Sequence, residues 1–347
     1  MQYVWYPSGH RVLRHSWVMQ ADIVQLYNTH GGYLSHRIVP ALAKKAPVVW
    51  RLSDMWPLTG HCAYSGACER WRTGCGQCPD LETYASIPFD TTALLWRIKR
   101  RILVEASPAI VAPSRWLERI AKASPAFAGL SIHHITNGID RTVFRPMPKD
   151  MARTLLGLPL DRPMILYCAQ VVSDNPRKGS ADALEAVGRL AGRADADLVV
   201  VGQGGDLLQQ HVPQRVYALG YLRDERLLAA AYAAADMMIA PSTAENLPNT
   251  ILEAMACGTP VVAYDSGGIG DAVGHGATGW LVPAGDRAAL ADGIVGLLAD
   301  RDLQRRLGAA SVRAIEDNFD AVREAKAFSE LYGHLIAVRR GAASERA

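Results

Sequence analysis

The sequence lacks the long hydrophobic stretches that mark membrane-spanning and secreted proteins. No run of eighteen apolar residues occurs in its 347 residues, so a membrane-spanning helix is not expected. The first eleven residues contain no hydrophobic region of the kind found in a signal peptide. Hydrophobic residues make up 49% and charged residues 20%, as in ordinary globular proteins. We therefore expect a cytoplasmic protein with two domains.

Cysteine is scarce outside one loop. Four of the six cysteines lie within the segment 56–80, at Cys62, Cys68, Cys75 and Cys78. Four thiolates with one C-x-x-C step can bind a structural zinc ion or form two disulfides. A reducing cytoplasm disfavours disulfides, and the spacing is not that of a standard zinc ribbon. A zinc ion and free thiols both remain open for this loop.

Basic residues are concentrated in the first part of the chain. Residues 1–145 carry 17 Lys and Arg against 9 Asp and Glu, and the remainder carries 20 against 25. Either the first part meets an anionic acceptor or membrane surface, or the difference is ordinary fluctuation. A predicted helix at 94–105 places Trp96 and Ile98 among basic residues, which suits a peripheral position at the inner membrane face. The alternative is a helix that packs by its apolar stripe. Nucleic acid is not expected, because no stacking partners or known binding motif accompany these charges.

Short apolar segments alternate with helical ones. In the first part, strands are expected at 23–27, 47–52 and 109–112, and polar residues follow the first two. The pattern restarts after Asp150, with further strands expected at 164–169, 198–202, 216–219, 237–240, 260–264 and 280–282. This alternation predicts an α/β protein with doubly wound parallel sheets.

The most informative stretch runs from 236 to 271. A polar loop with Glu245 follows one predicted strand, and a helix that carries Glu253 follows the loop. Gly267 and Gly268 come after the next strand, and ligands of parallel sheets bind at the carboxyl ends of strands. Carboxylates accept hydrogen bonds from sugar hydroxyls, while helix N-termini and bare glycine backbone offer N–H groups to phosphate. Alternatively, Glu245 caps the helix and Glu253 is exposed to solvent.

The segment S-T-A-E-N-L-P-N-T-I-L-E-A-M-A-C-G-T-P-V-V, followed by S-G-G, resembles glycosyltransferase family 4. Members are retaining nucleotide-sugar transferases with the two-domain GT-B fold. The resemblance implies that Glu245 contacts the donor sugar and that Glu253 holds the nucleotide ribose. It also implies donor contacts from the backbone at four residues: Asn246, Leu247, Gly267 and Gly268.

Two further loops of the same half are candidates for donor binding, and the first of them resembles a loop of the family. In Q-V-V-S-D-N-P-R-K-G, Lys178 matches the lysine that grips the donor diphosphate, and Arg177 precedes it. A lysine there stabilises the negative charge that develops on the leaving group. Gln170 stands in place of the family's usual arginine. Gly202, in G-Q-G-G, either lets the backbone approach the nucleotide or forms a plain turn.

The first half matches the family less closely. Asp54 matches the aspartate of a His-Asp pair that reaches the reacting sugar, but Ser53 stands where the histidine usually is. The cysteine-rich insert is similar to those of members from exopolysaccharide and lipopolysaccharide clusters. The expected first Rossmann-like domain, at 1–145, is incomplete, because Met1 falls near the third strand of such domains. The nucleotide-sugar domain is expected at 146–318, with a helix at 319–347 that crosses back to the first domain.

The resemblance implies retaining transfer of a hexose-type sugar from a UDP- or GDP-sugar to a glycan or lipid-linked acceptor. Glu245, Lys178 and Asp54 are expected to act in catalysis. The D-x-D at Asp195 and Asp197 flanks a predicted strand start, so no metal ion is expected in catalysis, and Lys178 and helix dipoles take its place. Two alternatives remain: a nucleotide-sugar epimerase on the same fold, and a truncated chain that only binds nucleotide.

Overall fold

The computed structural model describes residues 9–30, 33–172 and 176–344, which form parts of two compact units. The first unit comprises Met1–Thr136 and Ala325–Ala347, and the second comprises Asn137–Glu324. The division falls before the expected boundary at 145, because the segment after Asn137 pairs with the chain around Asp320. The N–H of Ile139 donates to the carbonyl of Phe319 (2.8 Å), and the N–H of Ala321 donates to the carbonyl of Ile139 (3.1 Å).

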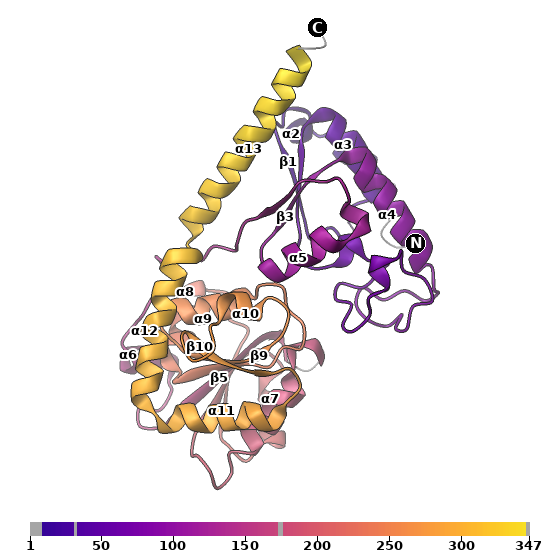
Figure 1. The fold of residues 1–347 in the computed structure, drawn as a ribbon. Coiled ribbons are helices and arrows are strands. Elements are labelled where there is room, and N and C mark those ends of the chain that lie inside the picture. Colours follow the sequence, from indigo (N-terminus) through magenta and orange to yellow (C-terminus); the bar gives the residue numbers. More distant parts are fainter. Residues whose placement is uncertain (1–8, 31–32, 173–175, 345–347) are drawn as a thin grey trace. The chain divides into compact units, whose positions relative to one another are not determined.

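The first unit is built on a parallel four-stranded sheet of order β1-β2-β3-β4 (Figure 1). The strands are β1 (Val24–Tyr27), β2 (Val48–Arg51), β3 (Ala109–Ala112) and β4 (Ile132–His134). The helices are α1 (Gly9–Val12), α2 (Ser16–Met19), α3 (Val39–Lys45), α4 (Thr92–Ala106) and α5 (Arg115–Ala123), with 3-10 turns at His36–Ile38, Trp56–Leu58, Arg70–Arg72 and Pro125–Phe127. The first three strands agree closely with the expected ones. The expected incompleteness of this domain stays a prediction.

Alternation along the strands gives this sheet two buried faces. Val48, Trp50 and Ile110 pack against α3, α4 and α5. Val49 and Val111 point the other way and pack against Phe328 and Leu331 of α13 (Ala321–Ser344). Helix α13 begins in the second unit and continues, from Ala325, in the first. The final helix therefore supplies the cover for a face that would otherwise be open.

The second unit contains a parallel six-stranded sheet of order β10-β9-β8-β5-β6-β7. The strands are β5 (Met164–Val171), β6 (Asp197–Gln203), β7 (Val216–Gly220), β8 (Met237–Ala240), β9 (Val261–Asp265) and β10 (Gly279–Pro283). From β5 the chain first fills one side of the sheet with β6 and β7, and then returns to the other side with β8. The carboxyl ends of β5 and β8 therefore form the topological switch point, where open α/β sheets bind ligands.

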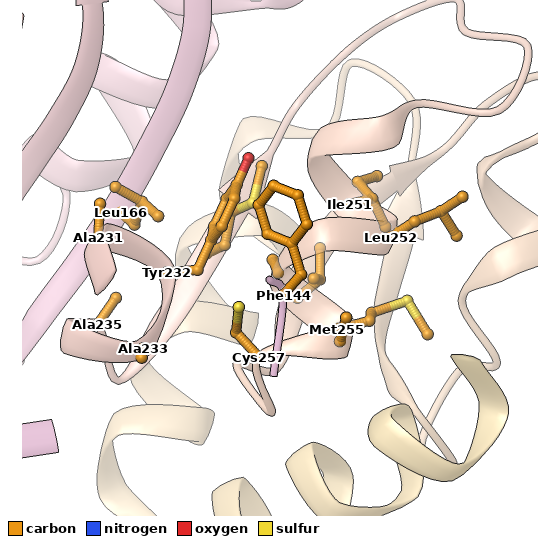
Figure 2. Close-up of a cluster of buried hydrophobic side chains, with 14 of the residues drawn as sticks. Phe144, Leu166, Ala231, Tyr232, Ala233, Ala235, Ile251, Leu252, Met255 and Cys257 are labelled. Carbon is orange, nitrogen blue, oxygen red and sulfur yellow. The ribbon is translucent and has the colours of Figure 1, made fainter. Parts of the chain in front are cut away.

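Helices cover both faces of this sheet. They are α6 (Lys149–Leu156), α7 (Ser180–Gly188), α8 (Glu225–Ala234), α9 (Asn249–Ala256), α10 (Ile269–Ala272), α11 (Arg287–Ala299) and α12 (Arg301–Asn318), with 3-10 turns at Pro176–Lys178 and Gly205–His211. Leu166 and Val199 face the side of α6, α8 and α9, whose core is drawn in part in Figure 2. Ile165 and Val200 face the side of α7 and α11. The expected doubly wound architecture is thereby confirmed.

Helix α4 packs by its apolar stripe. Trp96 is 6% exposed and belongs to the core of the first unit. Of the two alternatives for this helix, packing by the apolar stripe therefore agrees with the structure, and contact with a membrane stays a prediction. Arg97, Arg100 and Arg101 do lie on the exposed side of the helix. Among the residues that the structure describes, no helix is long and apolar enough to cross a membrane.

Lys99 of the same helix is buried, although lysine on an amphipathic helix is usually exposed. Its Nζ donates to the carbonyls of Trp56 (2.7 Å) and Thr59 (3.1 Å) and lies 3.3 Å from the centre of the Trp56 ring. Both carbonyls belong to the start of the cysteine-rich loop. Burial lowers the pKa of Lys99 to about 7, although Cys62, Cys75 and Asp54 oppose this shift. Lys99 thus anchors the loop to α4.

We expect the stability of the first unit to rise between pH 7 and 8.5, and Lys99→Met to reduce that rise. An unfolded lysine keeps its proton up to about pH 10.4, whereas buried Lys99 loses it near 7. At position 99 the unfolded chain therefore binds more protons across this window, so Lys99 alone contributes an increase of about 1–2 kcal/mol to the free energy of unfolding. Urea unfolding followed by tryptophan fluorescence suits the measurement, because seven of the eight tryptophans precede residue 137. Exposed Lys44 provides the control, since Lys44→Met should keep the rise. An identical pH dependence in the wild type and Lys99→Met would contradict this role.

Candidate functional site

An ion cluster lies where the loops after β5 and β8 meet. Glu245 follows β8, and its side chain is only 8% exposed. The carboxylate oxygen Oε1 lies 2.7 Å from Nη1 of Arg177 and 2.5 Å from Nζ of Lys178, both from the loop after β5. Three of the residues predicted for the donor site therefore converge at the topological switch point. The cluster carries a net charge of one positive unit, which favours an anionic ligand.

Hydrogen bonds to backbone carbonyls also hold these two loops in place. The N–H of Thr243 donates to the carbonyl of Arg177 (2.9 Å), and Nη1 of Arg177 donates to the carbonyl of Ala244 (2.6 Å). The hydroxyl of Tyr167 on β5 donates to the carbonyl of Lys178 (3.2 Å). The position of Lys178 is thereby defined by its own backbone as well as by Glu245.

The S-G-G segment after β9 positions Glu245 from the other side. Gly267 has a φ of +58°, and a Cβ atom there would lie 1.9 Å from the carbonyl oxygen of Glu245. Only glycine tolerates both conditions. The N–H of Gly268 donates to the same carbonyl (2.9 Å). These two glycines therefore support the glutamate backbone, while their contact with a donor stays a prediction.

Glu253 lies on α9, which begins after Pro248 as the sequence predicts. Its side chain is half-buried, and the hydroxyl of Tyr232 donates to Oε2 (2.8 Å). Burial raises the pKa of Glu253, the bond from Tyr232 lowers it, and neighbouring Glu225 raises it further. Asn246 and Leu247 are buried in the loop before this helix, and the Leu247 carbonyl accepts a bond from Asn137 Nδ2 (2.9 Å). Tyr232 was not identified from the sequence.

Gly202 is explained by packing in the sheet. It lies within β6 with a φ of +141°, and a Cβ atom would approach the carbonyl oxygen of Ala169 to 1.8 Å. The close approach of β5 thus requires glycine without any ligand, and a nucleotide contact at Gly202 stays a prediction. Gln170, at the end of β5, is exposed.

Asp54 follows β2 in the first unit and meets a histidine from the end of β1. Its Oδ2 lies 3.4 Å from Nε2 of His30, and its Oδ1 accepts the N–H of Trp56 (2.8 Å). His30 is 5% exposed and stacks on the Trp56 ring, with ring centres 5.6 Å apart. Burial lowers the pKa of His30, Asp54 raises it, and Lys99 lowers it further, so the imidazole is neutral near pH 7.

In the family pattern a histidine stands at the position of Ser53. In this chain His30, from the end of the neighbouring strand β1, lies beside Asp54. The signal in the sequence was the polar run Asn28-Thr29-His30, which marks a strand end without saying which strand lies beside it. Asp54 and His30 belong to the first unit, whereas Glu245, Lys178, Arg177 and Glu253 belong to the second.

The cysteine-rich loop contains free thiols. Cys62, Cys68, Cys75 and Cys78 form no disulfide, and together with His61 they line one cavity with room for about one water molecule. In the described parts of the chain, however, no three His, Cys, Asp or Glu side chains are placed to hold a metal ion. The structure therefore does not support the predicted zinc site.

Hydrogen bonds account for this outcome. The N–H of Gly60 donates to Cys75 Sγ (3.2 Å), and Cys78 Sγ donates to the carbonyl of Asp80 (3.2 Å). Burial raises the pKa of Cys62 to about 11 and also raises the pKa values of Cys75 and Cys78. The loop is held by these bonds and by Lys99.

Comparison with known proteins identifies a family domain within the second unit. The family model for group 1 glycosyl transferases matches residues 162–300. Alpha-maltose-1-phosphate synthase of Mycolicibacterium smegmatis is 32% identical over 254 residues, which cover 67% of this chain and 64% of that protein. D-inositol 3-phosphate glycosyltransferase of Nocardia farcinica is 36% identical over 190 residues, which cover 50% of this chain and 41% of that protein. The chain thus spans less than two thirds of the length of these relatives.

Solved structures share the fold. Sucrose-phosphate synthase from Thermosynechococcus elongatus has a TM-score of 0.71 at 24% identity and covers 91% of this chain and 74% of its own. Anabaena Alr3699/HepE, solved with UDP and glucose, has a TM-score of 0.69 at 21% identity, with coverages of 94% and 82%. The fold is therefore GT-B, and the matching domain and relatives place the chain in glycosyltransferase family 4, among the group 1 glycosyl transferases.

Proposed function

We propose that the chain transfers a hexose-type sugar from a nucleotide-diphosphate sugar to a glycan or lipid-linked acceptor, with retention of configuration. The observation that supports this most directly is the meeting of Arg177 and Lys178 with buried Glu245 at the switch point of the sheet. Cations beside a carboxylate suit a ligand with a diphosphate next to a polyhydroxylated ring.

Donor binding exchanges partners within this cluster. The diphosphate offers several oxygens to Arg177 and Lys178, which both contact Oε1 of Glu245 in the structure. As the cations turn to the phosphates, the carboxylate becomes free to accept hydrogen bonds from the sugar hydroxyls. Glu253, on the helix that follows, is left to accept from the ribose hydroxyls.

Lys178 and the N-terminus of α7, which begins two residues later, stabilise the negative charge that develops on the leaving diphosphate. A positioned cation that interacts more strongly as the bond breaks lowers the barrier of the transfer. The acceptor hydroxyl attacks on the face from which the phosphate departs, and that phosphate takes the hydroxyl's proton. This course preserves the configuration without a metal ion.

In the first unit, we assign sugar or acceptor recognition to Asp54 and His30. A neutral imidazole that carries its proton on Nε2, the nitrogen 3.4 Å from Oδ2 of Asp54, has Nδ1 as an acceptor for a hydroxyl group. The exposed Arg97, Arg100 and Arg101 of α4 are suited to an anionic, lipid-linked acceptor at the membrane surface, as in cell-surface polysaccharide biosynthesis.

Similar proteins favour UDP- and GDP-linked donors. Anabaena Alr3699/HepE was solved with UDP-glucose, and a GDP-mannose-dependent alpha-mannosyltransferase of M. smegmatis is 35% identical over 211 residues. Calorimetry with UDP and with GDP distinguishes the two bases. Incubation with UDP-glucose or GDP-mannose, with and without a glycan acceptor, then separates the alternatives. Isomerised donor without acceptor indicates an epimerase, and nucleotide binding without any reaction indicates a binding protein.

Glu253→Ala should weaken binding of the free nucleoside diphosphate by about 1–3 kcal/mol, because a ribose hydroxyl loses a charged acceptor. Isothermal titration calorimetry measures the change directly. Exposed Glu330 of α13 gives a matched control, and Glu330→Ala should bind like the wild type. An unchanged affinity in Glu253→Ala would remove this residue from the site.

Lys178→Ala should lower kcat more than it raises the KM for the donor, since the ammonium acts mainly on charge that develops during bond cleavage. Initial rates over a range of donor concentrations separate the two constants. Lys326→Ala, at an exposed position on α13, serves as the control. If only KM rises while kcat is kept, Lys178 merely anchors the bound donor.

A further inference from the structure

Helix α8 consists of small residues around one large side chain. Tyr232 lies between the alanine runs 229–231 and 233–235, and it is 0% exposed. Alanine side chains let α8 lie close to α6 and α9, so the phenol ring fills the space between these elements. In Figure 2 the ring stands between Leu166 and Phe144, with its hydroxyl oxygen at the far end from the α8 backbone. Phenylalanine would satisfy the same apolar surroundings.

The hydroxyl group is the feature that packing does not require. It donates to Oε2 of Glu253 at 2.8 Å, and the next polar atom, Cys168 Sγ, lies at 3.7 Å. A buried hydroxyl destabilises a core unless it has a partner, so its presence depends on the carboxylate. Burial raises the pKa of Tyr232 far above its usual value, which keeps the phenol protonated and therefore a donor.

For Glu253 the bond has two consequences. It selects one orientation of a flexible side chain before any ligand arrives, which reduces the entropy lost on binding. It also occupies one acceptor position of Oε2 and leaves Oε1 without a bond from Tyr232. Glu253 is half-buried, so the residue is not fully enclosed in the core.

We propose that Tyr232 is a positioning residue that orients Glu253 to accept hydrogen bonds from the ribose of the donor nucleotide. The inference rests on the proposed function, in which Glu253 meets the ribose. Tyr232 itself does not touch the nucleotide and acts only through the carboxylate. The distinctive consequence is that Tyr232 contributes to affinity only when the ligand has ribose hydroxyls.

The test compares UDP with 2′,3′-dideoxy-UDP, using the full chain and isothermal titration calorimetry. Tyr232→Phe keeps the ring and removes the hydroxyl, and we expect it to weaken UDP binding by about three- to tenfold. Its affinity for dideoxy-UDP should equal that of the wild type. In a Glu253→Gln background, Tyr232→Phe should change UDP affinity less than twofold, because the oriented carboxylate is already lost.

Tyr264→Phe is a matched control. Tyr264 is also 0% exposed, and its hydroxyl donates to a carboxylate oxygen of Asp182 at 2.9 Å, away from Glu253. This variant loses the same kind of bond but should bind UDP like the wild type. Melting temperatures of all variants show whether each remains folded, and the Glu253→Gln comparison of UDP with dideoxy-UDP tests the ribose contact without altering the core.

The outcomes distinguish a failure of the positioning role of Tyr232 from a failure of the ribose contact of Glu253 or of the proposed function. Suppose that the wild type binds UDP. The positioning role is overturned if Tyr232→Phe binds UDP as tightly as the wild type does, or if its affinity falls by the same factor for UDP and for dideoxy-UDP. Tyr232 is then a core residue only. If wild-type affinity is equal for UDP and dideoxy-UDP, the ribose assignment of Glu253 fails, and Tyr232 with it. If the wild type binds neither UDP nor GDP, the proposed function itself is wrong.

Discussion

The contact of Glu245 with Arg177 and Lys178 is the constraint on which the second unit's site depends. A carboxylate that is 8% exposed is strongly disfavoured unless cations and hydrogen-bond donors surround it. Here the cations come from the loop after β5 and the carboxylate from the loop after β8, so neither loop can take its position alone. Glycine at 267 follows from the same constraint, because the Glu245 backbone occupies the space of a side chain there. The two loops are consequently held together by these opposite charges.

In the first unit, the charged group at the centre of the packing is a lysine and not a carboxylate. Lys99 is a buried cation whose hydrogen bonds go to main-chain carbonyls and whose charge lies on the face of Trp56. His30 lies against the same tryptophan and faces Asp54. Trp56 therefore joins the end of β2, the cysteine-rich loop and α4 in one packed group. The free thiols of the loop are arranged around this group, which explains why the loop has a defined structure without disulfides.

Local patterns predicted much of the fold, and the questions that they left open share one cause. The strands at 109–112 and 237–240 agree with the structure to the residue, because a short apolar run with polar ends has few alternatives in a parallel sheet. The surroundings of Trp96 stayed open because helical periodicity shows which residues share a face, but not what covers that face. The state of the four thiols stayed open for a similar reason: spacing places them in one loop, while burial and local hydrogen bonds decide their protonation and direction.

The sequence by itself determined the strand–loop–helix units and the spacing of Glu245 and Glu253, since both follow from interactions between residues close along the chain. It also carried the family motif, which predicted the fold and the donor-binding half. Only the tertiary structure decided that His30 meets Asp54, that Arg177 and Lys178 meet Glu245, and that Tyr232 meets Glu253. These pairs are separated by about twenty to seventy residues, and their meeting depends on the order of strands in each sheet and on how closely alanine-rich α8 packs. Strand order results from the competition of all segments for one core, so no single stretch of sequence contains it.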